Sequence, residues 1–217
     1  KESELGWIPK EWEVKALQDV TEKIQDGTHF SPQTSDGEFL YVTSKNIRFG
    51  YMDISNCERI SKSEHDLIYK RCDVKLGDIL LTKDGANTGN ATINTVFEPF
   101  SLLSSVAFIR CNPDLSAPNF VVQYLLSPIG QNRLKELMSG NAITRLTLTK
   151  INGFKILVPP TNEQEQIGEC LKTFDKTVLS EKEQLSKYAQ IKSGLMQDLL
   201  TGKVRVKIDE LEEEVVS

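Results

Sequence analysis

Apolar side chains follow one narrow stripe through the C-terminal part of the chain, between Asn162 and Leu200. Alternating steps of four and three residues place ten residues on this stripe: Ile167, Leu171, Phe174, Val178, Glu181, Leu185, Tyr188, Lys192, Leu195 and Leu199. Eight of the ten are apolar, and such a heptad seam is typical of a helix that pairs with another helix. At ~1.5 Å per residue the predicted helix is roughly 55–60 Å long, which is too long to fold back against a small domain.

Residues 1–160 carry shorter patterns that predict strands and helices in one compact domain. Apolar runs bounded by Gly, Asn, Asp or Pro predict strands at Phe39–Thr43, Asp78–Thr82, Ala91–Val96, Ser105–Cys111 and Phe154–Val158. Turn and cap residues between the strands predict three helices. The first is capped by Ser63 and runs to Tyr69, the second begins at Ser116, and the third begins at Ser127-Pro128 and ends at Gly140.

Two prolines, Pro159-Pro160, end the last strand and mark a domain boundary. Asn162 with Glu165 predicts a capping-box start for the long helix, and Gly202 predicts its end. We therefore predict an α+β protein with a compact mixed domain over residues 1–160, a long helix over 161–202 and an acidic tail over 203–217. Gly168 and Gly194 lie inside this helix at a cost of about 1 kcal/mol each, which indicates close packing at both points.

The composition is that of a globular protein, with 39% hydrophobic and 26% charged residues. No apolar run approaches the roughly 18–20 residues of a membrane span, and no signal peptide opens the sequence, so we expect a cytoplasmic protein. The four cysteines form no close pair and the chain has two histidines. We expect neither disulfides nor a metal site.

The net charge of −5 comes from the C-terminal tail. Residues 208–217 contain five acidic residues and no Lys or Arg, which leaves 26 acidic and 26 basic residues in positions 1–207. A neutral body counts mildly against nucleic-acid binding, although it can still present a local basic face.

Three polar segments are candidates for ligand contact. Asp26-Gly27-Thr28-His29 has side chains that can hydrogen-bond base edges, but Asp-Gly is also a common turn. Residues 83–90 follow a predicted strand and contain two glycines that would let the backbone approach phosphates or bases. This segment matches neither a P-loop nor a dinucleotide motif, and a plain hairpin loop explains it equally well. Arg145 can bind guanine or phosphate, or lie on the surface without a role.

Catalytic motifs are weak. Glu13-Val14-Lys15 and Asp73-Val74-Lys75 superficially match the acidic-x-Lys half of a nuclease site, but such triplets often arise by chance in a chain this charged. Pro159-Pro160 lacks the neighbours of an amino-methyltransferase motif, and no residues suggest a catalytic triad.

In their order and spacing, several of these segments resemble the specificity subunit of type I restriction-modification systems. The first part of the chain resembles a target recognition domain, on the residues Leu5-Gly6-Trp7-Ile8-Pro9, Trp12-Glu13-Val14, Asp26-Gly27-Thr28-His29 and Gly77-Asp78-Ile79-Leu80-Leu81. The second part resembles the helical region that follows it, on Val158-Pro159-Pro160, Glu163-Gln164-Glu165-Gln166-Ile167 and Leu195–Val204. Such subunits usually hold two recognition domains and two long helices, so this chain resembles a half-subunit.

The resemblance implies a DNA-reading protein that carries no catalytic residue, no cofactor and no metal. The candidate DNA contacts are polar residues in loops near these motifs: Thr28, His29, Lys45, Asn46, Lys83, Asn87, Thr88 and Arg145. The predicted dimer contacts, in an antiparallel intermolecular coiled coil, are the apolar seam residues Ile167, Leu171, Phe174, Val178, Leu185, Tyr188, Leu195 and Leu199. Expected partners are double-stranded DNA, a second copy of the chain, methyltransferase subunits and, in the full complex, restriction subunits. S-adenosylmethionine and ATP would be held by those partners.

The sequence does not exclude two other functions. One is a stand-alone DNA-modifying enzyme that uses Asp73 and Lys75, although a convincing third carboxylate is lacking. The other is a coiled-coil adaptor that binds protein rather than DNA. In the second case, exchange of the segments at 26–30 and 83–90 would leave every activity unchanged.

Overall fold

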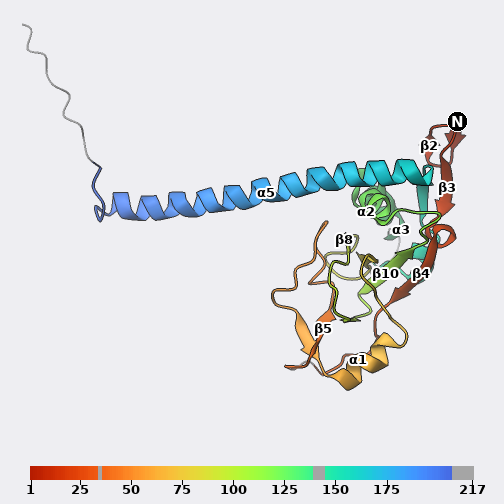
Figure 1. Ribbon diagram of the computed structural model, residues 1–217, viewed down its shortest axis with the longest axis horizontal. Coiled ribbons are helices and arrows are strands. Elements are labelled where there is room, and N and C mark those ends of the chain that lie inside the picture. The colour runs from red at the N-terminus through yellow and green to blue at the C-terminus, as the bar shows by residue number, and fades with distance from the viewer. Residues whose placement is uncertain (34–35, 139–144, 207–217) are drawn as a thin grey trace, which may run out of the picture. The chain divides into compact units, whose positions relative to one another are not determined.

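A computed structural model describes residues 1–33, 36–138 and 145–206 of the 217-residue chain (Figure 1). Contacts within the chain divide it into two units, Lys1–Lys172 and Thr173–Ser217. The division falls inside the last helix, whereas the sequence places the domain boundary before that helix, at Pro159-Pro160. Within the described residues, no helix is both long and apolar enough to cross a membrane.

The first unit alternates short strands with short helices. Its strands are β1 (Glu2–Ser3), β2 (Gly6–Trp7), β3 (Glu13–Ala16), β4 (Thr21–Asp26), β5 (Phe39–Val42), β6 (Glu58–Ile60), β7 (Ile79–Thr82), β8 (Ala91–Ile93), β9 (Ser101–Leu102), β10 (Val106–Cys111) and β11 (Lys155–Val158). A 3-10 turn, η1 (Leu17–Val20), precedes β4, and the α-helices are α1 (Lys62–Tyr69), α2 (Pro118–Leu126), α3 (Pro128–Met138), α4 (Leu148–Asn152) and α5 (Thr161–Leu200). The α+β class predicted from the sequence is confirmed.

An antiparallel sheet with the strand order β4-β10-β7-β8 separates two hydrophobic cores. Successive side chains of a strand point to opposite faces, so Ile79 and Leu81 of β7 enter one core while Leu80 enters the other. Helices α2, α3 and α4 contribute to the first core, and α1 with the β6-β5-β9 sheet contributes to the second. Because both faces of the sheet are covered, β7 is buried at every position and reads as a continuous apolar run.

The N-terminal segment pairs with the last strand of the unit. Strand β3 runs antiparallel to β11, with Val14 opposite Leu157. This pairing closes the domain by joining residues far apart in the sequence, and it precedes the Pro159-Pro160 break directly.

The five predicted strands are confirmed as β5, β7, β8, β10 and β11, each one to three residues shorter than expected. Strand β4 was missed because Thr21–Asp26 is mostly polar and shows no apolar alternation beyond Ile24. It forms because β10 supplies a long antiparallel partner, with Ile24 opposite Ile109.

Two predicted helix starts were wrong. The cap of α1 is Ser61 rather than Ser63, and its hydroxyl accepts the backbone N–H of Glu64 at 3.4 Å. Helix α5 begins at Thr161, so Asn162 lies inside it instead of capping it. The carbonyl of Pro160 accepts the first N–H bonds, from Glu163 and Gln164. The predicted helix end at Gly140 lies outside the described residues.

The first turns of α5 are anchored in the first unit by buried contacts. The Gln164 side chain is almost fully buried, and its amide donates to the carbonyls of Leu115 and Pro159 while its oxygen accepts from Ala117 N–H at 3.0 Å. Gly168 lies so close to α2 that an added Cβ would be 2.7 Å from the backbone nitrogen of Phe120. The predicted close packing at Gly168 is therefore confirmed.

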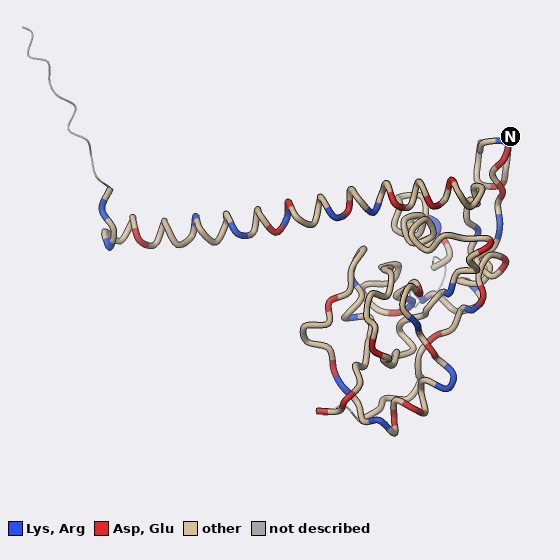
Figure 2. The backbone as a smooth tube through the Cα atoms, viewed as in Figure 1, with Lys and Arg blue, Asp and Glu red and all other residues tan. Residues whose placement is uncertain are grey.

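The second unit continues α5 as one helix to Leu200. Gly202 follows with a φ of +72°, a left-handed conformation that favours glycine, and its N–H bonds to the carbonyl of Leu199. The 40 residues of α5 correspond to a length of roughly 60 Å. Lysines and acidic residues are interspersed along this part of the helix (Figure 2).

Replacement of the two helix glycines by alanine should have opposite effects. We expect Gly168→Ala to destabilise the protein by about 1–3 kcal/mol, because the new methyl group overlaps the backbone of α2. Gly194→Ala is the matched control, since an added Cβ there meets no described atom within 4 Å outside its own stretch of helix, so the close packing predicted at Gly194 is wrong within this chain. It should stabilise the helix by up to ~1 kcal/mol. Urea unfolding followed by circular dichroism measures both, and equal stability of Gly168→Ala and wild type would contradict the packing.

Candidate functional site

Two of the polar segments leave the central sheet at the same edge. Strands β4 and β7 both pair antiparallel with β10, so they run in the same direction and end beside the start of β10. Asp26 ends β4, and Lys83 directly follows β7. The segments after both strands therefore emerge together, although 57 residues separate Asp26 from Lys83 in the numbering.

Hydrogen bonds bring two further segments to this edge. Asn87 Nδ2 donates to the Ser44 carbonyl at 3.3 Å, which connects residues 43–53 to residues 83–90. Leu146 N–H donates to the Lys83 carbonyl at 2.8 Å, which places the neighbouring Arg145 beside the same segment. We call residues 27–30, 43–53, 83–90 and 145–146 together the loop cluster.

A buried carboxylate, Asp26, lies beneath the loop cluster. Its side chain is 4% exposed and has three cationic or potentially cationic neighbours, each 3.3 Å away. Lys83 Nζ and His29 Nε2 approach Oδ2, and Arg71 Nη2 approaches Oδ1. The Lys83 side chain is only 2% exposed, so the Asp26–Lys83 ion pair is inaccessible to water. Removal of either partner would therefore destabilise the folded protein.

The remaining residues of the Asp-Gly-Thr-His segment fix the loop backbone. A Cβ on Gly27 would lie 2.0 Å from the Leu102 carbonyl oxygen, so only glycine fits. Thr28 is buried, and its backbone exchanges hydrogen bonds with Leu102 and Ser104. The segment is therefore a structural junction that presents one exposed side chain, His29.

The segment after β5 is fixed in a similar way by Asn46. Its side-chain oxygen accepts from Thr43 N–H at 2.9 Å, and its amide donates to the Asp53 carbonyl at 3.1 Å. Asn46 is buried and closes the loop on itself. Lys45 beside it is exposed.

The eight candidate contacts thus fall into two classes, although the structure brings all of them together. Thr28, Asn46 and Lys83 are buried and have internal partners. The accessible members are His29, Lys45, Asn87, Thr88 and Arg145. Asn87 and Thr88 are half-buried, whereas the Arg145 side chain is 44% exposed. Its Nε atom lies 3.7 Å from Oδ2 of Asp84.

A second charged network, missed from the sequence, lies at the opposite end of β7 and β10 from the loop cluster. Arg110 of β10 forms a two-point contact with Asp78, from Nε at 3.0 Å and Nη2 at 2.8 Å. It also contacts Asp73, which pairs in addition with Lys23 at 2.5 Å. No local motif signals these partners, because each pair joins residues that are far apart in the sequence.

This network bears on the suggested nuclease triplet at Asp73. Burial alone would raise the pKa of Asp73, but hydrogen bonds from Lys23 and Arg110 outweigh burial and lower the pKa. The carboxylate is therefore an ion-pair partner. Across residues 1–33, 36–138 and 145–206, no group of three or more His, Cys, Asp or Glu side chains is placed to hold a metal ion.

The apolar stripe of α5 is largely exposed on this chain. Its first member, Ile167, is half-buried and packs on the first core. The seven apolar members from Leu171 onward are 41–69% exposed. A row of this size on one helix is the kind of surface that a partner covers.

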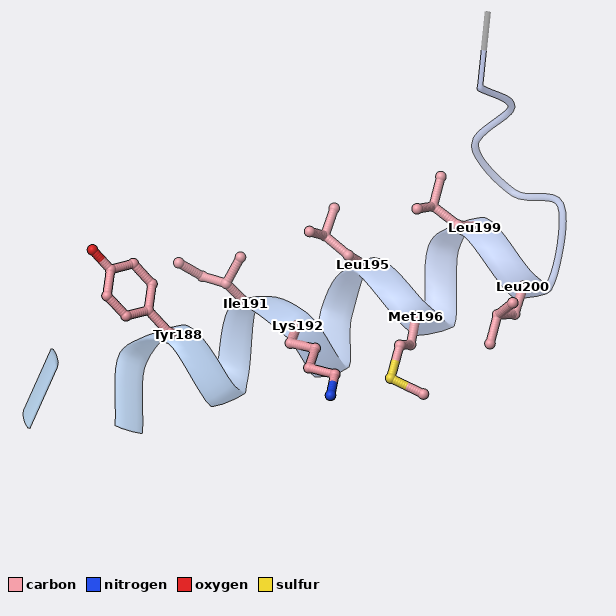
Figure 3. Close-up of a pocket in the computed structure, with 7 residues that line it drawn as sticks. All are labelled: Tyr188, Ile191, Lys192, Leu195, Met196, Leu199 and Leu200. Atoms are coloured by element: carbon pink, nitrogen blue, oxygen red, sulfur yellow. The ribbon is translucent and has the colours of Figure 1, made fainter. Parts of the chain in front are cut away.

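Near the end of α5, seven residues line a shallow depression (Figure 3). Tyr188, Ile191, Leu195 and Leu199 project from one side of the helix, and Lys192, Met196 and Leu200 from the other. Lys192 therefore lies within an apolar surface, where a lysine requires an acidic partner if the surface is covered.

Comparisons with known proteins match this arrangement. Residues 9–190 match the family described as "Type I restriction modification DNA specificity domain". The chain is 27% identical over 214 residues to the type I restriction enzyme MjaVIII specificity subunit of Methanocaldococcus jannaschii, covering 95% of this chain and 49% of that protein. The chain therefore spans about half the length of the curated relatives it matches.

Solved structures share the fold. A chain from "Structural basis underlying complex assembly and conformational transition of the type I R-M system" superposes with a TM-score of 0.62 at 16% identity, covering 89% of this chain and 46% of that one. The HsdS subunit from Thermoanaerobacter tengcongensis gives a TM-score of 0.57 at 15% identity, with the same coverage of both chains.

The Asp26–Lys83 pair gives a direct stability test. We expect Lys83→Met to cost about 3 kcal/mol, because it removes one partner of a buried pair and leaves the carboxylate undercompensated. Asp84→Asn is the matched control, since it breaks the exposed contact with Arg145 and should cost less than ~1 kcal/mol. Urea denaturation measures both variants. If Lys83→Met were as stable as wild type, the ion pair would not hold the loop cluster.

Proposed function

This chain belongs to the type I restriction modification DNA specificity family, and we propose that it is the DNA-reading subunit of such a system, in a half-length form. The loop cluster carries this proposal. It presents exposed or half-exposed hydrogen-bonding side chains on segments whose backbones are fixed by the Asp26–Lys83 pair and by Asn46. Preorganised donors and acceptors of this kind suit readout of base edges and phosphates.

The division of roles follows the burial of each residue. His29, Lys45, Asn87, Thr88 and Arg145 are the proposed DNA contacts. Thr28, Asn46 and Lys83, which the sequence also suggested as contacts, instead hold the loops in position. Asn87 and Arg145 are suited to base reading, because an amide pairs with adenine and a guanidinium with guanine through two hydrogen bonds each.

We further propose that two copies of the chain pair through α5. The exposed stripe supports an antiparallel arrangement with its two-fold axis between Ser186 and Lys187. In that register each seam residue from Phe174 to Leu199 faces another at the same distance from the axis: Phe174 with Leu199, Val178 with Leu195, Glu181 with Lys192, and Leu185 with Tyr188. Lys192 thereby gains the acidic partner that its apolar surroundings require.

A two-fold dimer would place one recognition domain for each half of a split target. Symmetric protein requires a symmetric site, so the expected target is an interrupted palindrome. A helix of roughly 60 Å is compatible with half-sites on the order of one to two turns of DNA apart, at about 34–36 Å per turn. Methyltransferase subunits would dock on the dimer and carry out the chemistry with S-adenosylmethionine, and restriction subunits would join in the full complex.

Neither other function considered from the sequence gains support. A stand-alone nuclease would need an available carboxylate at Asp73, which is held by Lys23 and Arg110. An adaptor without DNA contact would not require a rigid polar loop cluster. The matched relatives are named specificity subunits.

Selection from a randomised duplex library tests DNA reading. The chain, assembled with its cognate methyltransferase subunits, should enrich a defined sequence. Arg145→Ala should relax the preference at one position of each half-site by about 1–3 kcal/mol. Arg59→Ala is the control, because Arg59 contacts the carbonyls of Gly37 and Glu38, outside the loop cluster. Enrichment of no sequence by the wild-type assembly would refute the proposed function.

Sedimentation tests the dimer. We expect Leu185→Asp combined with Leu195→Asp to convert the dimer to a monomer, because two carboxylates enter the apolar seam. Lys187→Asp is the control, since it introduces the same side chain on the face of α5 away from the stripe. A particle that remains dimeric after the double substitution would contradict pairing through α5.

A further inference from the structure

We propose that Arg71, flanked by His29, forms a binding site for a phosphate of the DNA backbone, built on the buried carboxylate of Asp26. This inference rests on the proposed function. It assigns a role to Arg71, which no sequence motif indicated, and a sequence-independent role to His29.

Arg71 has one terminal nitrogen held by the protein and its other two side-chain nitrogens open. Its Nη2 atom donates to Oδ1 and to the carbonyl of Asp26, both at 3.3 Å, and also to the carbonyl of Gly27. Among the described residues, Nε and Nη1 have no hydrogen-bond partner, and half of the side chain is exposed. The guanidinium is therefore oriented in advance, and its Nε–H and Nη1–H groups can each still donate a charge-assisted hydrogen bond to a phosphate oxygen.

His29 contacts the same carboxylate as Arg71. Its Nε2 approaches Oδ2 of Asp26 at 3.3 Å, so His29 and Arg71 contact the two oxygens of one carboxylate. The His29 side chain is 57% exposed. Both groups are thus held at the same point while remaining accessible to a ligand.

The charges around Asp26 do not cancel. One carboxylate faces Lys83 and Arg71, which leaves an excess of one positive charge before His29 is counted. The second charged network does cancel, because Lys23 and Arg110 balance Asp73 and Asp78. A phosphodiester carries one negative charge and would neutralise the excess beside a protein surface of low dielectric constant.

The position of the site favours DNA over an acidic protein partner. His29 belongs to the loop cluster, and the pair Asp26–Lys83 connects Arg71 to the segment that carries Asn87 and Thr88. A phosphate contact at this point would fix the register of the duplex while the other exposed residues read bases.

The salt dependence of binding tests this assignment. Affinity for a random-sequence duplex would be measured for the assembled complex over a range of salt concentrations. We expect Arg71→Gln to weaken binding about tenfold and to reduce the slope of log K against log salt by about 0.9 per site, because one phosphate contact is lost. Lys155→Gln, which removes one positive charge from β11, should leave the slope unchanged.

Library selection distinguishes phosphate binding from base reading. The sequence enriched by Arg71→Gln and by His29→Ala should equal that of wild type, with lower affinity for every duplex. His29→Ala alters an exposed side chain and so keeps the test valid if Arg71→Gln does not fold. An unchanged slope in Arg71→Gln, or a base preference altered in either variant, would overturn the phosphate site while leaving DNA reading intact.

Loss of methyltransferase assembly in a folded Arg71→Gln variant would assign the site to an acidic protein segment and equally overturn it. A wild-type complex that enriches no sequence would instead refute the proposed function.

Discussion

The ion pair between Asp26 and Lys83 is the constraint on which the recognition surface depends. Both side chains are buried, and each ends or directly follows a strand that pairs with β10. Separation of the two charges would leave buried Lys83 without its carboxylate and Asp26 with only the more exposed Arg71 and His29, so the segments that follow β4 and β7 are held together. Asp26 also orients Arg71 and His29 at the surface. One buried carboxylate thus links the stability of the fold to the placement of exposed polar groups.

Helix α5 also has two roles, because it belongs to both units of the chain. Near its start, Gln164 and Gly168 are buried against the first unit by hydrogen bonds and by close backbone packing. Further along, the apolar residues of the stripe are exposed in the part of the chain that the structure describes. Ile167 lies at the transition, since it continues the heptad pattern but packs on the first core. One helix thereby supplies both an internal anchor and the surface proposed for pairing.

Much of the architecture could be predicted because the relevant signals are local. The apolar runs of β7 and β10 and the turn glycine at Gly202 each act over a few residues. Strand β4 could not be predicted, because its polar sequence becomes a strand only beside β10. For the site, polarity in loops correctly indicated the segments that converge. It could not separate exposed Arg145 from buried Lys83, because the burial of Lys83 depends on Asp26, 57 residues away. Arg71 and Arg110 were missed for the same reason.

In the function proposed for this chain, the loop cluster contacts DNA and a paired helix sets the distance between two copies. Sequencing of methylated bases in cells that express this chain with its cognate methyltransferase decides whether that description is right. A two-fold dimer predicts methylation at one interrupted palindrome, with identical half-sites at a fixed spacing. Methylation at an asymmetric or uninterrupted sequence would contradict the two-fold arrangement, and absence of any sequence-specific methylation would contradict DNA reading itself.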